Sequence, residues 1–389
     1  MREGLTYKKL KDIGVVITGN TPSTKDKENY SSDDYCFVKP SDIAKDGVSI
    51  IKDSESYISE KGYNSSRKLP KGSVLTTCIG IIGKVGILEI DATCNQQINA
   101  IIPFRTILPK YLALAILSVK SQLEAMANAP VVPIINKGDF SNVEIPVPSF
   151  EEQERIVAEL DLLTGIIDKQ KQQLKELDTL AQSIFYDMFG SVDNNTKNFM
   201  VKCLNEVFQL ITDGTHQTPQ YTDDILHGFK FLSAKDVVSG VIDWTRIKYI
   251  PESLHNELYK RLAPRRGDIL LCKNGTTGIC ALVETDEVFD IYVSLALLRT
   301  EKEYNKKYLV YAINNPSTKS QFDDSLKGVG VPNLHLGEIK KTKILVPPIE
   351  LQSSFAKKIE SIESQKQSIN RSLAESQKLF DYTMDKYFG

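Results

Sequence analysis

The sequence has no long hydrophobic run. Its longest apolar stretch, "YLALAILSV" at residues 111–119, is about half of the roughly 18 residues that a membrane-spanning helix needs. The first ten residues, "MREGLTYKKL", lack the apolar centre of a secretory signal peptide. With 41% hydrophobic and 25% charged residues, the 389-residue chain has a globular composition and a length that suits two or three domains. We expect a cytoplasmic protein without a membrane anchor.

Metal-binding patterns are also missing. The six cysteines contain no CxxC pair, and the four histidines contain no HxxxH pair. In the cytoplasm the cysteines should be reduced and packed as small apolar side chains, and we expect no metal. The formal net charge of −2 gives no overall attraction to nucleic acid. A DNA partner would therefore have to be held by local basic patches or together with other subunits.

Catalytic motifs are equally absent. "VPPIE" at residues 346–350 has two prolines but lacks the Asn or Asp before them and the aromatic residue after them that a methyltransferase would carry. "GIIGK" at residues 80–84 is too short for a phosphate-binding loop and fits a β-hairpin turn better. No nucleophile, base and orienting residue can be assembled from the sequence. We predict that the chain is not an enzyme and holds no cofactor itself.

One segment of the chain occurs twice. "IPVPSFEEQERIVAEL" at residue 145 returns as "ILVPPIELQSSFAKKI" at residue 344, a shift of 199 residues that places Gln153 on Gln352. The match extends without a gap from residues 131–190 to residues 330–389, ending on Gly190 and Gly389. Residues 131 and 330–332 of these stretches lie outside the residues that the structure describes. A gapless internal repeat indicates two copies of one architectural unit.

Each copy has the period of a long helix. Apolar residues recur in steps of three and four, which keeps a narrow stripe facing a partner helix, as in the a and d seam of a coiled coil. Pro148 and Pro347 mark the helix starts, and the two glycines mark the stops. The sequence thus predicts two helices that pair antiparallel. The predicted seam consists of Ile156, Leu160, Leu163, Ile167, Leu174, Leu177, Ile184, Phe355, Ile359, Ile362, Ile369, Leu373 and Phe380, with Gln170, Lys366, Ser376 and Thr383 as polar interruptions.

The segments between the helices share an outline and differ in their loops. "LKDIGVVITGNT" at residue 10 matches "LNEVFQLITDGT" at residue 204, which sets Asp213 in the place of Gly19. "KGSVLTTCIGIIGKVG" at residue 71 matches "RGDILLCKNGTTGICA" at residue 266. Short β-type runs broken by Gly, Pro, Asn and Asp predict a mixed α/β (α+β) fold. We expect similar domains at residues 1–148 and 191–347, with helices at 149–190 and 348–389.

The sequence resembles the specificity subunits of type I restriction-modification systems. "INKGDFSNVEIPVPSFEEQERIVAEL" is similar to that family's junction between a target recognition domain and a conserved helix, and "ITGNTPS", "KPSDI" and "LPKGSVLTTCIGIIGKVG" resemble parts of its recognition domain. The resemblance covers essentially the whole chain. It implies a non-catalytic subunit in which each domain reads one half of a bipartite, asymmetric DNA target while the helix pair sets the gap.

The resemblance also implies partners. Two modification subunits, which bind S-adenosylmethionine and methylate adenine, would dock around the helices, and restriction subunits driven by ATP and Mg²⁺ would add translocation and cleavage. Two alternatives remain open from the sequence. One is the recognition part of a fused restriction and methylation enzyme, although the chain's ending on a repeated helix argues against it. The other is a non-catalytic scaffold whose coiled coil joins two protein-binding domains.

Candidate DNA contacts are polar and basic side chains in Gly- and Asn-containing loops, since base edges and phosphates require Arg, Lys, Asn and Gln, and Ser or Thr can serve either. A solvated turn is an equally good interpretation of each loop. The candidates in the first domain are Asn20, Thr21, Ser23, Lys25, Tyr63, Asn64, Arg67, Lys68, Asn136 and Lys137. Those in the second are Thr215, His216, Gln217, Lys273, Asn274, Thr276, Thr277, Asn333 and His335. Gln96 and Gln97 are expected to be structural.

Overall fold

The computed structural model describes residues 6–127, 132–238, 240–326 and 333–389. It divides into two compact units, each described by itself. Unit 1 comprises residues 1–171 and 371–389, and unit 2 comprises residues 172–370. The division falls within the two long helices and not at their ends, so it does not test the domain limits expected from the sequence. Those limits stay a prediction.

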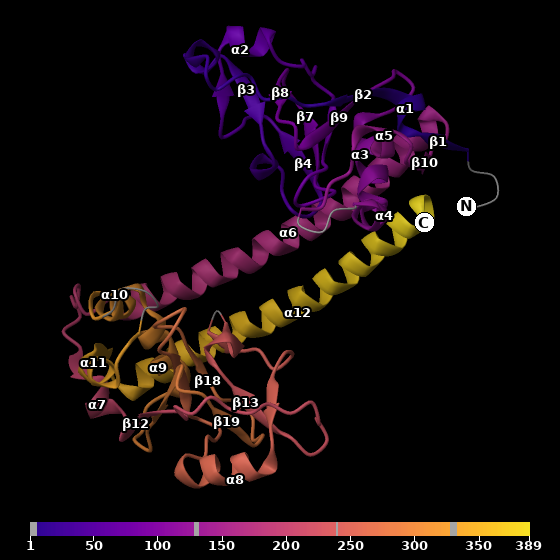
Figure 1. The fold of residues 1–389 in the computed structure, drawn as a ribbon. Helices are drawn as coiled ribbons and strands as arrows, with labels where there is room; N and C mark the ends of the chain where they lie inside the picture. The colour runs from indigo at the N-terminus through magenta and orange to yellow at the C-terminus, as the bar shows by residue number, and fades with distance from the viewer. Residues whose placement is uncertain (1–5, 128–131, 239, 327–332) are drawn as a thin grey trace. The chain divides into compact units, whose positions relative to one another are not determined.

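Unit 1 is a mixed α/β unit built on a five-stranded sheet of order β2-β9-β6-β7-β4 (Figure 1). Only β4 runs parallel to its neighbour in this sheet. Every residue of β6 and β7 is buried, as expected for strands covered on both faces. A sheet of order β5-β3-β8 and the pair β1-β10 complete the strands. The elements are β1 (Tyr7–Lys9), α1 (Leu10–Ile13), β2 (Gly14–Thr18), β3 (Tyr35–Val38), β4 (Val48–Ile51), β5 (Tyr57–Ile58), α2 (Glu60–Asn64), β6 (Val74–Thr77), β7 (Val85–Leu88), β8 (Thr93–Cys94), β9 (Ile98–Pro103), α3 (Pro109–Ser118), α4 (Lys120–Met126), α5 (Lys137–Ser141), β10 (Glu144–Pro146) and the start of α6 (Phe150–Phe189).

Unit 2 repeats this plan. Its main sheet has the order β12-β20-β17-β18, a second sheet has the order β16-β13-β19, and the pairs β11-β21 and β14-β15 complete the strands. The elements are β11 (Met200–Cys203), α7 (Leu204–Val207), β12 (Leu210–Asp213), β13 (Phe229–Leu232), β14 (Val237–Val238), β15 (Val241–Ile242), β16 (Lys248–Ile250), α8 (Glu252–Arg261), β17 (Ile269–Cys272), β18 (Cys280–Leu282), β19 (Phe289–Ile291), β20 (Leu295–Arg299), α9 (Lys306–Asn314), α10 (Pro316–Asp324), α11 (Leu336–Lys341), β21 (Lys343–Val346) and the start of α12 (Ile349–Phe388). The predicted duplication of a mixed α/β unit is therefore confirmed.

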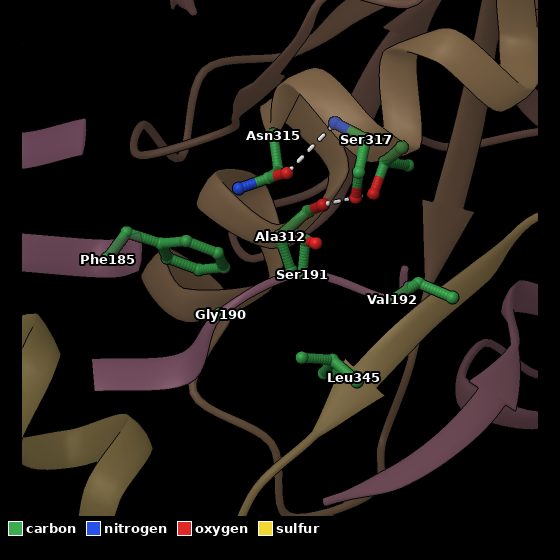
Figure 2. A pocket seen from close by; sticks show the side chains of 9 residues that line it. Phe185, Gly190, Ser191, Val192, Ala312, Asn315, Ser317 and Leu345 are labelled. Carbon is green, nitrogen blue, oxygen red and sulfur yellow. Dashed lines mark hydrogen bonds between the residues drawn. The ribbon is translucent and has the colours of Figure 1, made fainter. Parts of the chain in front are cut away.

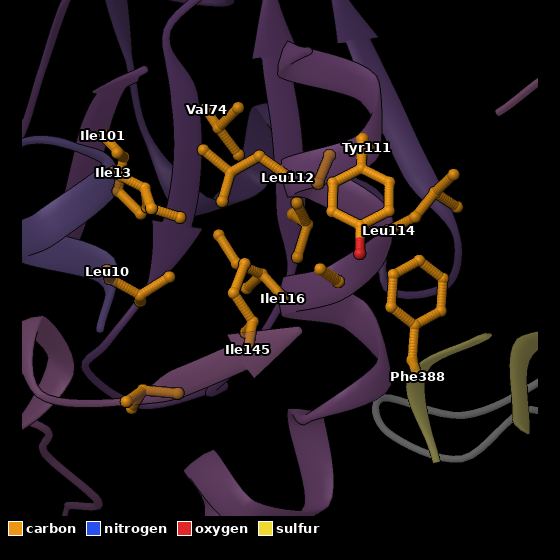
Figure 3. Packing of buried hydrophobic residues seen from close by; sticks show 14 of the residues in the cluster. Leu10, Ile13, Val74, Ile101, Tyr111, Leu112, Leu114, Ile116, Ile145 and Phe388 are labelled. Atoms are coloured by element: carbon orange, nitrogen blue, oxygen red, sulfur yellow. The ribbon is translucent and has the colours of Figure 1, made fainter. Parts of the chain in front are cut away.

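The core of each unit includes the end of a long helix. In unit 1, Phe388 of α12 packs beside Tyr111 of α3, with ring centroids 5.3 Å apart, among residues of α1, β6, β9 and β10 (Figure 3). In unit 2, Phe189 of α6 and Phe355 of α12 pack on Tyr308 of α9, and the Phe189 and Tyr308 rings are 4.9 Å apart. Because each helix end is part of a hydrophobic core, the helix pair is anchored by burial at both ends.

The two predicted long helices are present, and they run antiparallel within each unit. In unit 1, the Tyr387 hydroxyl donates to Glu159 at 2.6 Å, and the Gln170 side chain donates to Ser372 at 2.8 Å. In unit 2, Lys366 pairs with Asp178, and Phe355 packs on Phe185. Residues later in α6 contact residues earlier in α12, as expected for antiparallel helices. Pro148 and Pro347 precede the helices, and Gly190, with a φ of +74°, ends α6.

Every residue of the predicted seam is buried or half-buried. The seam is tightest at its ends and only half-buried along its middle, where Leu174, Leu177, Ile369 and Leu373 lie. Two of the polar interruptions, Gln170 and Lys366, make the inter-helix contacts just described. Polar side chains at seam positions cost stability and favour one register over its alternatives.

The repeated glutamine holds each helix onto its unit. Gln153 is fully buried; its amide nitrogen donates to the carbonyls of Thr106 and Pro148 at 3.1 Å, and its oxygen accepts from the Leu108 N–H at 3.0 Å. Gln352 does the same in unit 2, accepting from the Asn305 N–H and donating to the Pro347 carbonyl. The shared glutamine of the repeat is therefore a buried clamp between a loop and the first turn of a helix.

We expect Gln153→Met to lower the free energy of unfolding by about 2 kcal/mol, because methionine keeps the volume but leaves three partly buried backbone groups without their side-chain partner. Gln352→Met should cost less, since Gln352 serves two such groups. Urea unfolding of the two variants beside the parent protein measures both effects. Equal stability of all three proteins would contradict the clamp.

Candidate nucleic-acid interface

A hairpin turn with two left-handed glycines forms the centre of the candidate interface in each unit. In unit 1, β6 and β7 are joined by a turn in which Gly80 and Gly83 have φ of +79° and +76°. The Thr77 N–H donates to Lys84 and the Gly83 N–H donates to Thr77, at 3.0 and 2.9 Å. In unit 2, Gly275 and Gly278 have φ of +77° and +81° between β17 and β18. The "GIIGK" segment is thus a hairpin turn and not a phosphate loop.

The backbone hydrogen bonds establish which residues of the two units are equivalent. The Cys78 N–H donates to Gln97, and the Lys273 N–H donates to Ser294, both at 2.8 Å. Further along, the Ile135 N–H donates to Cys78 and the Leu334 N–H donates to Lys273, both at 2.9 Å. Cys78 and Lys273 therefore occupy the same place in the two units.

The same comparison corrects one sequence inference. Gly19 is not replaced by Asp213; its counterpart is Gly214. The Gly19 N–H donates to Ile98 and the Gly214 N–H donates to Leu295, and these acceptors are the first residues of the equivalent strands β9 and β20. A Cβ at either glycine would lie 2.0–2.1 Å from a backbone carbonyl oxygen, so glycine is required at both. One extra residue between α7 and β12 shifts the alignment from there on. Asp213 instead matches Thr18.

The three candidate loops of unit 2 meet around a surface cavity of about 550 Å³. Five predicted contact residues line it: His216, Lys273, Asn274, Asn333 and His335. The loops are joined by a bridge between Asn274 and Asn333 and by the hydrogen bond from Leu334 to Lys273. Asp213, Val293, Leu336 and Gly337 complete the lining.

The remaining unit 2 candidates lie beside this cavity and not in its lining. Thr215 is buried, and its hydroxyl accepts from the Gln217 N–H at 3.2 Å. In the hairpin turn, Thr276 is exposed and Thr277 is buried. The cavity therefore gathers residues from three loops that are far apart in the sequence.

A buried ion pair forms part of the cavity wall. The Lys273 ammonium donates to the Asp213 carboxylate, and the two side chains are only 7% and 12% exposed. His216, which is largely exposed, lies 3.3 Å from the same carboxylate. Burial alone would raise the pKa of Asp213, but the hydrogen bond and charge of Lys273, with a contribution from His216, hold that pKa below its ordinary value. Lys273 is thus a paired, buried cation and not a free surface charge.

In unit 1, the loop at residues 19–25 meets the end of α2. The Asn20 side chain accepts from the Arg67 N–H at 2.8 Å, and Thr21 donates to Gln96 at 2.5 Å. Lys68 donates to Asn64 and lies over the ring of Tyr63, 4.9 Å from its centroid. Tyr63 in turn stacks on Tyr35. Ser23 and Lys25 are exposed at the outer part of the loop.

Asn136 and Lys137 begin α5, next to the hairpin turn. The Asn136 side chain caps the helix by accepting from the Asp139 N–H at 2.9 Å, and Lys137 is exposed. The segment before them is held to the turn because the Gly80 N–H donates to Pro133 at 3.0 Å. The structure thus brings residues 134–137 beside the hairpin turn, as it does with Asn333 and His335 in unit 2.

Sequence reasoning missed two residues of this surface. Asp213 was treated only as a glycine replacement, although a carboxylate that ends a partly buried strand requires a partner. Gln96 was taken as structural, yet it is exposed and its side chain contacts the candidate Thr21. The interaction of a loop glutamine with a residue 75 positions away has no local sequence signal.

A second, smaller cavity and a buried His–Asp pair in unit 2 do not line the candidate interface. A cavity of about 10 Å³ lies where α6 ends and α10 begins, lined by Phe185, Gly190, Asn315 and Ser317 among others, and holds at most one water (Figure 2). His255 pairs with Asp290 at 2.7 Å, both side chains are buried, and the His255 ring stacks on Phe229. Burial raises the pKa of Asp290 against the opposing effect of His255. This pair holds α8 on β19.

Neither a metal site nor a membrane span is found in the described part of the chain. No group of three or more His, Cys, Asp or Glu side chains in the described ranges is placed to hold a metal ion. Within the same ranges, each helix is too short or too polar to cross a bilayer.

Two α/β units that present different loops on one backbone frame, joined through a helix pair, define a class of duplicated recognition protein. The chain belongs to the type I restriction modification DNA specificity domain family, whose model matches residues 2–179 and again residues 196–376. It therefore carries two copies of that domain.

Named relatives and solved structures agree with this assignment. The chain is 28% identical to the type I restriction enzyme MjaIX specificity subunit of Methanocaldococcus jannaschii, over 90% of this chain and 84% of that protein. It is 20% identical to the EcoKI specificity subunit of Escherichia coli K12, over 99% and 89%. The fold resembles the type I S subunit from M. genitalium, with a TM-score of 0.55 at 13% identity over 100% and 98% of the two chains. A structure from work on complex assembly of the type I R-M system gives a TM-score of 0.60 at 17% identity over the same shares.

Proposed function

We propose that this chain is the DNA-specificity subunit of a type I restriction-modification complex and catalyses no reaction itself. Each unit reads one half of a bipartite, asymmetric target in double-stranded DNA, and the helix pair sets the gap between the halves. The observation that carries the proposal is the duplication: equivalent loops on one frame hold different side chains, such as Lys273 in the place of Cys78. Loops on a fixed scaffold are where specificity changes without loss of the fold.

The chemistry of the loops supports DNA as the ligand. Polar side chains gather at the loops of each unit: amide and imidazole groups such as Asn274, Asn333 and His335 in unit 2, and amide and guanidinium groups such as Asn20 and Arg67 in unit 1. These groups match the donors and acceptors on base edges and phosphates. The individual contacts proposed from the sequence stay predictions.

We propose that two modification subunits, which bind S-adenosylmethionine and methylate adenine, dock on α6 and α12, and that ATP- and Mg²⁺-dependent restriction subunits join them. Apolar side chains that lie off the helix seam support docking: Leu162, Leu180 and Tyr382 are 71%, 47% and 68% exposed. S-adenosylmethionine, ATP and Mg²⁺ belong to those partners and not to this chain.

The net charge of −2 favours weak DNA binding by the chain alone. The cytoplasm is the expected compartment.

Native mass spectrometry and a methyl-transfer assay test this assignment. After co-expression with a candidate adenine-methyltransferase modification subunit from the same genome, we expect one copy of this chain with two modification subunits. The complex should transfer methyl groups from S-adenosylmethionine to DNA, and the chain alone should transfer none. Transfer by the chain alone would make it an enzyme. Failure of soluble partners to associate would instead favour a scaffold that joins two protein-binding domains.

A further inference from the structure

The hairpin turns of the two units differ in one consistent respect. Unit 1 has Ile79 and Ile81 in and beside its turn, where unit 2 has Asn274 and Thr276, as the paired glycines and backbone hydrogen bonds establish. The segment bridged to the turn differs in the same way: Ile79 pairs with Ile134 in unit 1, and Asn274 pairs with Asn333 in unit 2. Three isoleucines thus stand where the other unit has three polar residues.

These isoleucines form a small apolar surface, defined here as Ile79, Ile81 and Ile134. Ile81 is 57% exposed, Ile134 is 43% exposed and Ile79 is half-buried. Val132, in the same bridged segment, is 43% exposed. Apolar side chains scattered singly on a surface need no explanation, but a group of them on one turn indicates a contact site.

The position of this surface identifies its occupant. In unit 2 the equivalent residues Asn274 and Asn333 line the cavity that the proposed function assigns to DNA. In unit 1 the surface adjoins Asn136 and Lys137, which begin α5 one and two residues after the buried Ile135. The surface therefore lies among groups suited to a DNA groove. The thymine C5-methyl is the apolar group that a base pair presents in the major groove.

We propose that Ile79, Ile81 and Ile134 make unit 1 a reader of thymine methyl groups, whereas unit 2 reads its half-site through polar contacts. This inference rests on the proposed function and adds to it the chemistry that distinguishes the two half-sites. It requires that the half-site of unit 1 contain thymine within reach of the turn.

Replacement of thymine by deoxyuridine removes the methyl and leaves base pairing unchanged. With the modification complex and duplexes that carry the mapped target, each contacted methyl should account for about fourfold in affinity, which corresponds to about 0.8 kcal/mol. We expect the loss at thymines of one half-site only. In the Ile79→Asn, Ile81→Thr, Ile134→Asn variant, which takes its residues from unit 2, deoxyuridine should no longer weaken binding at that half-site.

The outcomes separate this inference from the proposed function. If no deoxyuridine replacement lowers the affinity while sequence-specific binding is intact, the methyl-reading role alone is overturned. A half-site of unit 1 without thymine would overturn it as well. A deoxyuridine effect that persists in the triple variant would assign methyl reading to other residues. Absence of sequence-specific binding by the parent complex would overturn the proposed function itself. Binding at the other half-site in the triple variant controls for folding.

Discussion

Replacement of Lys273 by cysteine is expected to lower the free energy of unfolding by about 3 kcal/mol, because it leaves the Asp213 carboxylate buried without its main partner. Cysteine is the residue that unit 1 has at the equivalent position, Cys78, so the frame accommodates it. His216 is too exposed to replace the lost ammonium fully. Urea unfolding followed by circular dichroism measures the change.

The double variant Asp213→Thr, Lys273→Cys provides the matched control. It gives unit 2 the two neutral residues that unit 1 has at these positions, Thr18 and Cys78, and removes the buried carboxylate; Asn99, which accepts from the Thr18 hydroxyl at 2.6 Å, has Ala296 as its counterpart in unit 2. We expect the double variant to recover most of the lost stability while its target preference in one half-site changes. A double variant that is as unstable as Lys273→Cys would contradict the account of the pair as a replaceable unit. The exposed substitution Lys260→Cys on α8 should be neutral.

The same ion pair has a defined pH dependence. The folded state lowers the pKa of Asp213 from its ordinary value of 3.8. Its contribution to stability is therefore complete above that ordinary value and is lost as the pH falls through the lowered pKa. The difference in free energy of unfolding between the parent protein and the double variant should therefore move in favour of the double variant in this acidic range. A difference that instead moved in favour of the parent on acidification would contradict the direction of the pKa shift.

Insertion of one heptad into each long helix is expected to widen the gap in the DNA target by about three base pairs. Seven helical residues add about 10.5 Å, and successive base pairs are about 3.4 Å apart. The natural points are between residues 171 and 172 and between 370 and 371, where the compact units divide. A full heptad preserves the seam, so both half-sites should stay unchanged.

Insertion into α6 alone is the control, because it puts the seam residues of the two helices out of step. We expect that variant to lose stability and methylation activity. The methylation motif of the double insertion gives the gap directly. An unchanged gap in a stable, active double insertion would show that the helix pair does not set the spacing.

The helices could be predicted from the sequence because their signals are local. Pro148 and Gly190 bound α6, and the three-and-four spacing of residues such as Ile156 and Leu160 gives its partner-facing side. The glycine-bounded hairpin turns were predictable for the same reason. The duplicated fold followed from the gapless shift between Gln153 and Gln352.

The details of the candidate site were less predictable because they depend on contacts between distant segments. A lysine is usually exposed, and nothing near Lys273 in the sequence indicates that Asp213, sixty positions away, neutralises it in a buried site. Because one residue is inserted before β12, the gapless sequence alignment placed Asp213, and not Gly214, opposite Gly19. The buried role of Gln153 likewise depends on the loop at Thr106, which local patterns do not reveal.

Target recognition by this chain can be tested by a map of adenine methylation across a host genome, obtained by single-molecule sequencing. The host would express this chain with the candidate modification subunit, and a strain without this chain would serve as the control. We expect a two-part motif with a fixed gap that is present only with this chain, and one half of it should change in the Asp213→Thr, Lys273→Cys variant. A map without chain-dependent methylation, with both proteins soluble and associated, would contradict the assignment of target recognition to this chain.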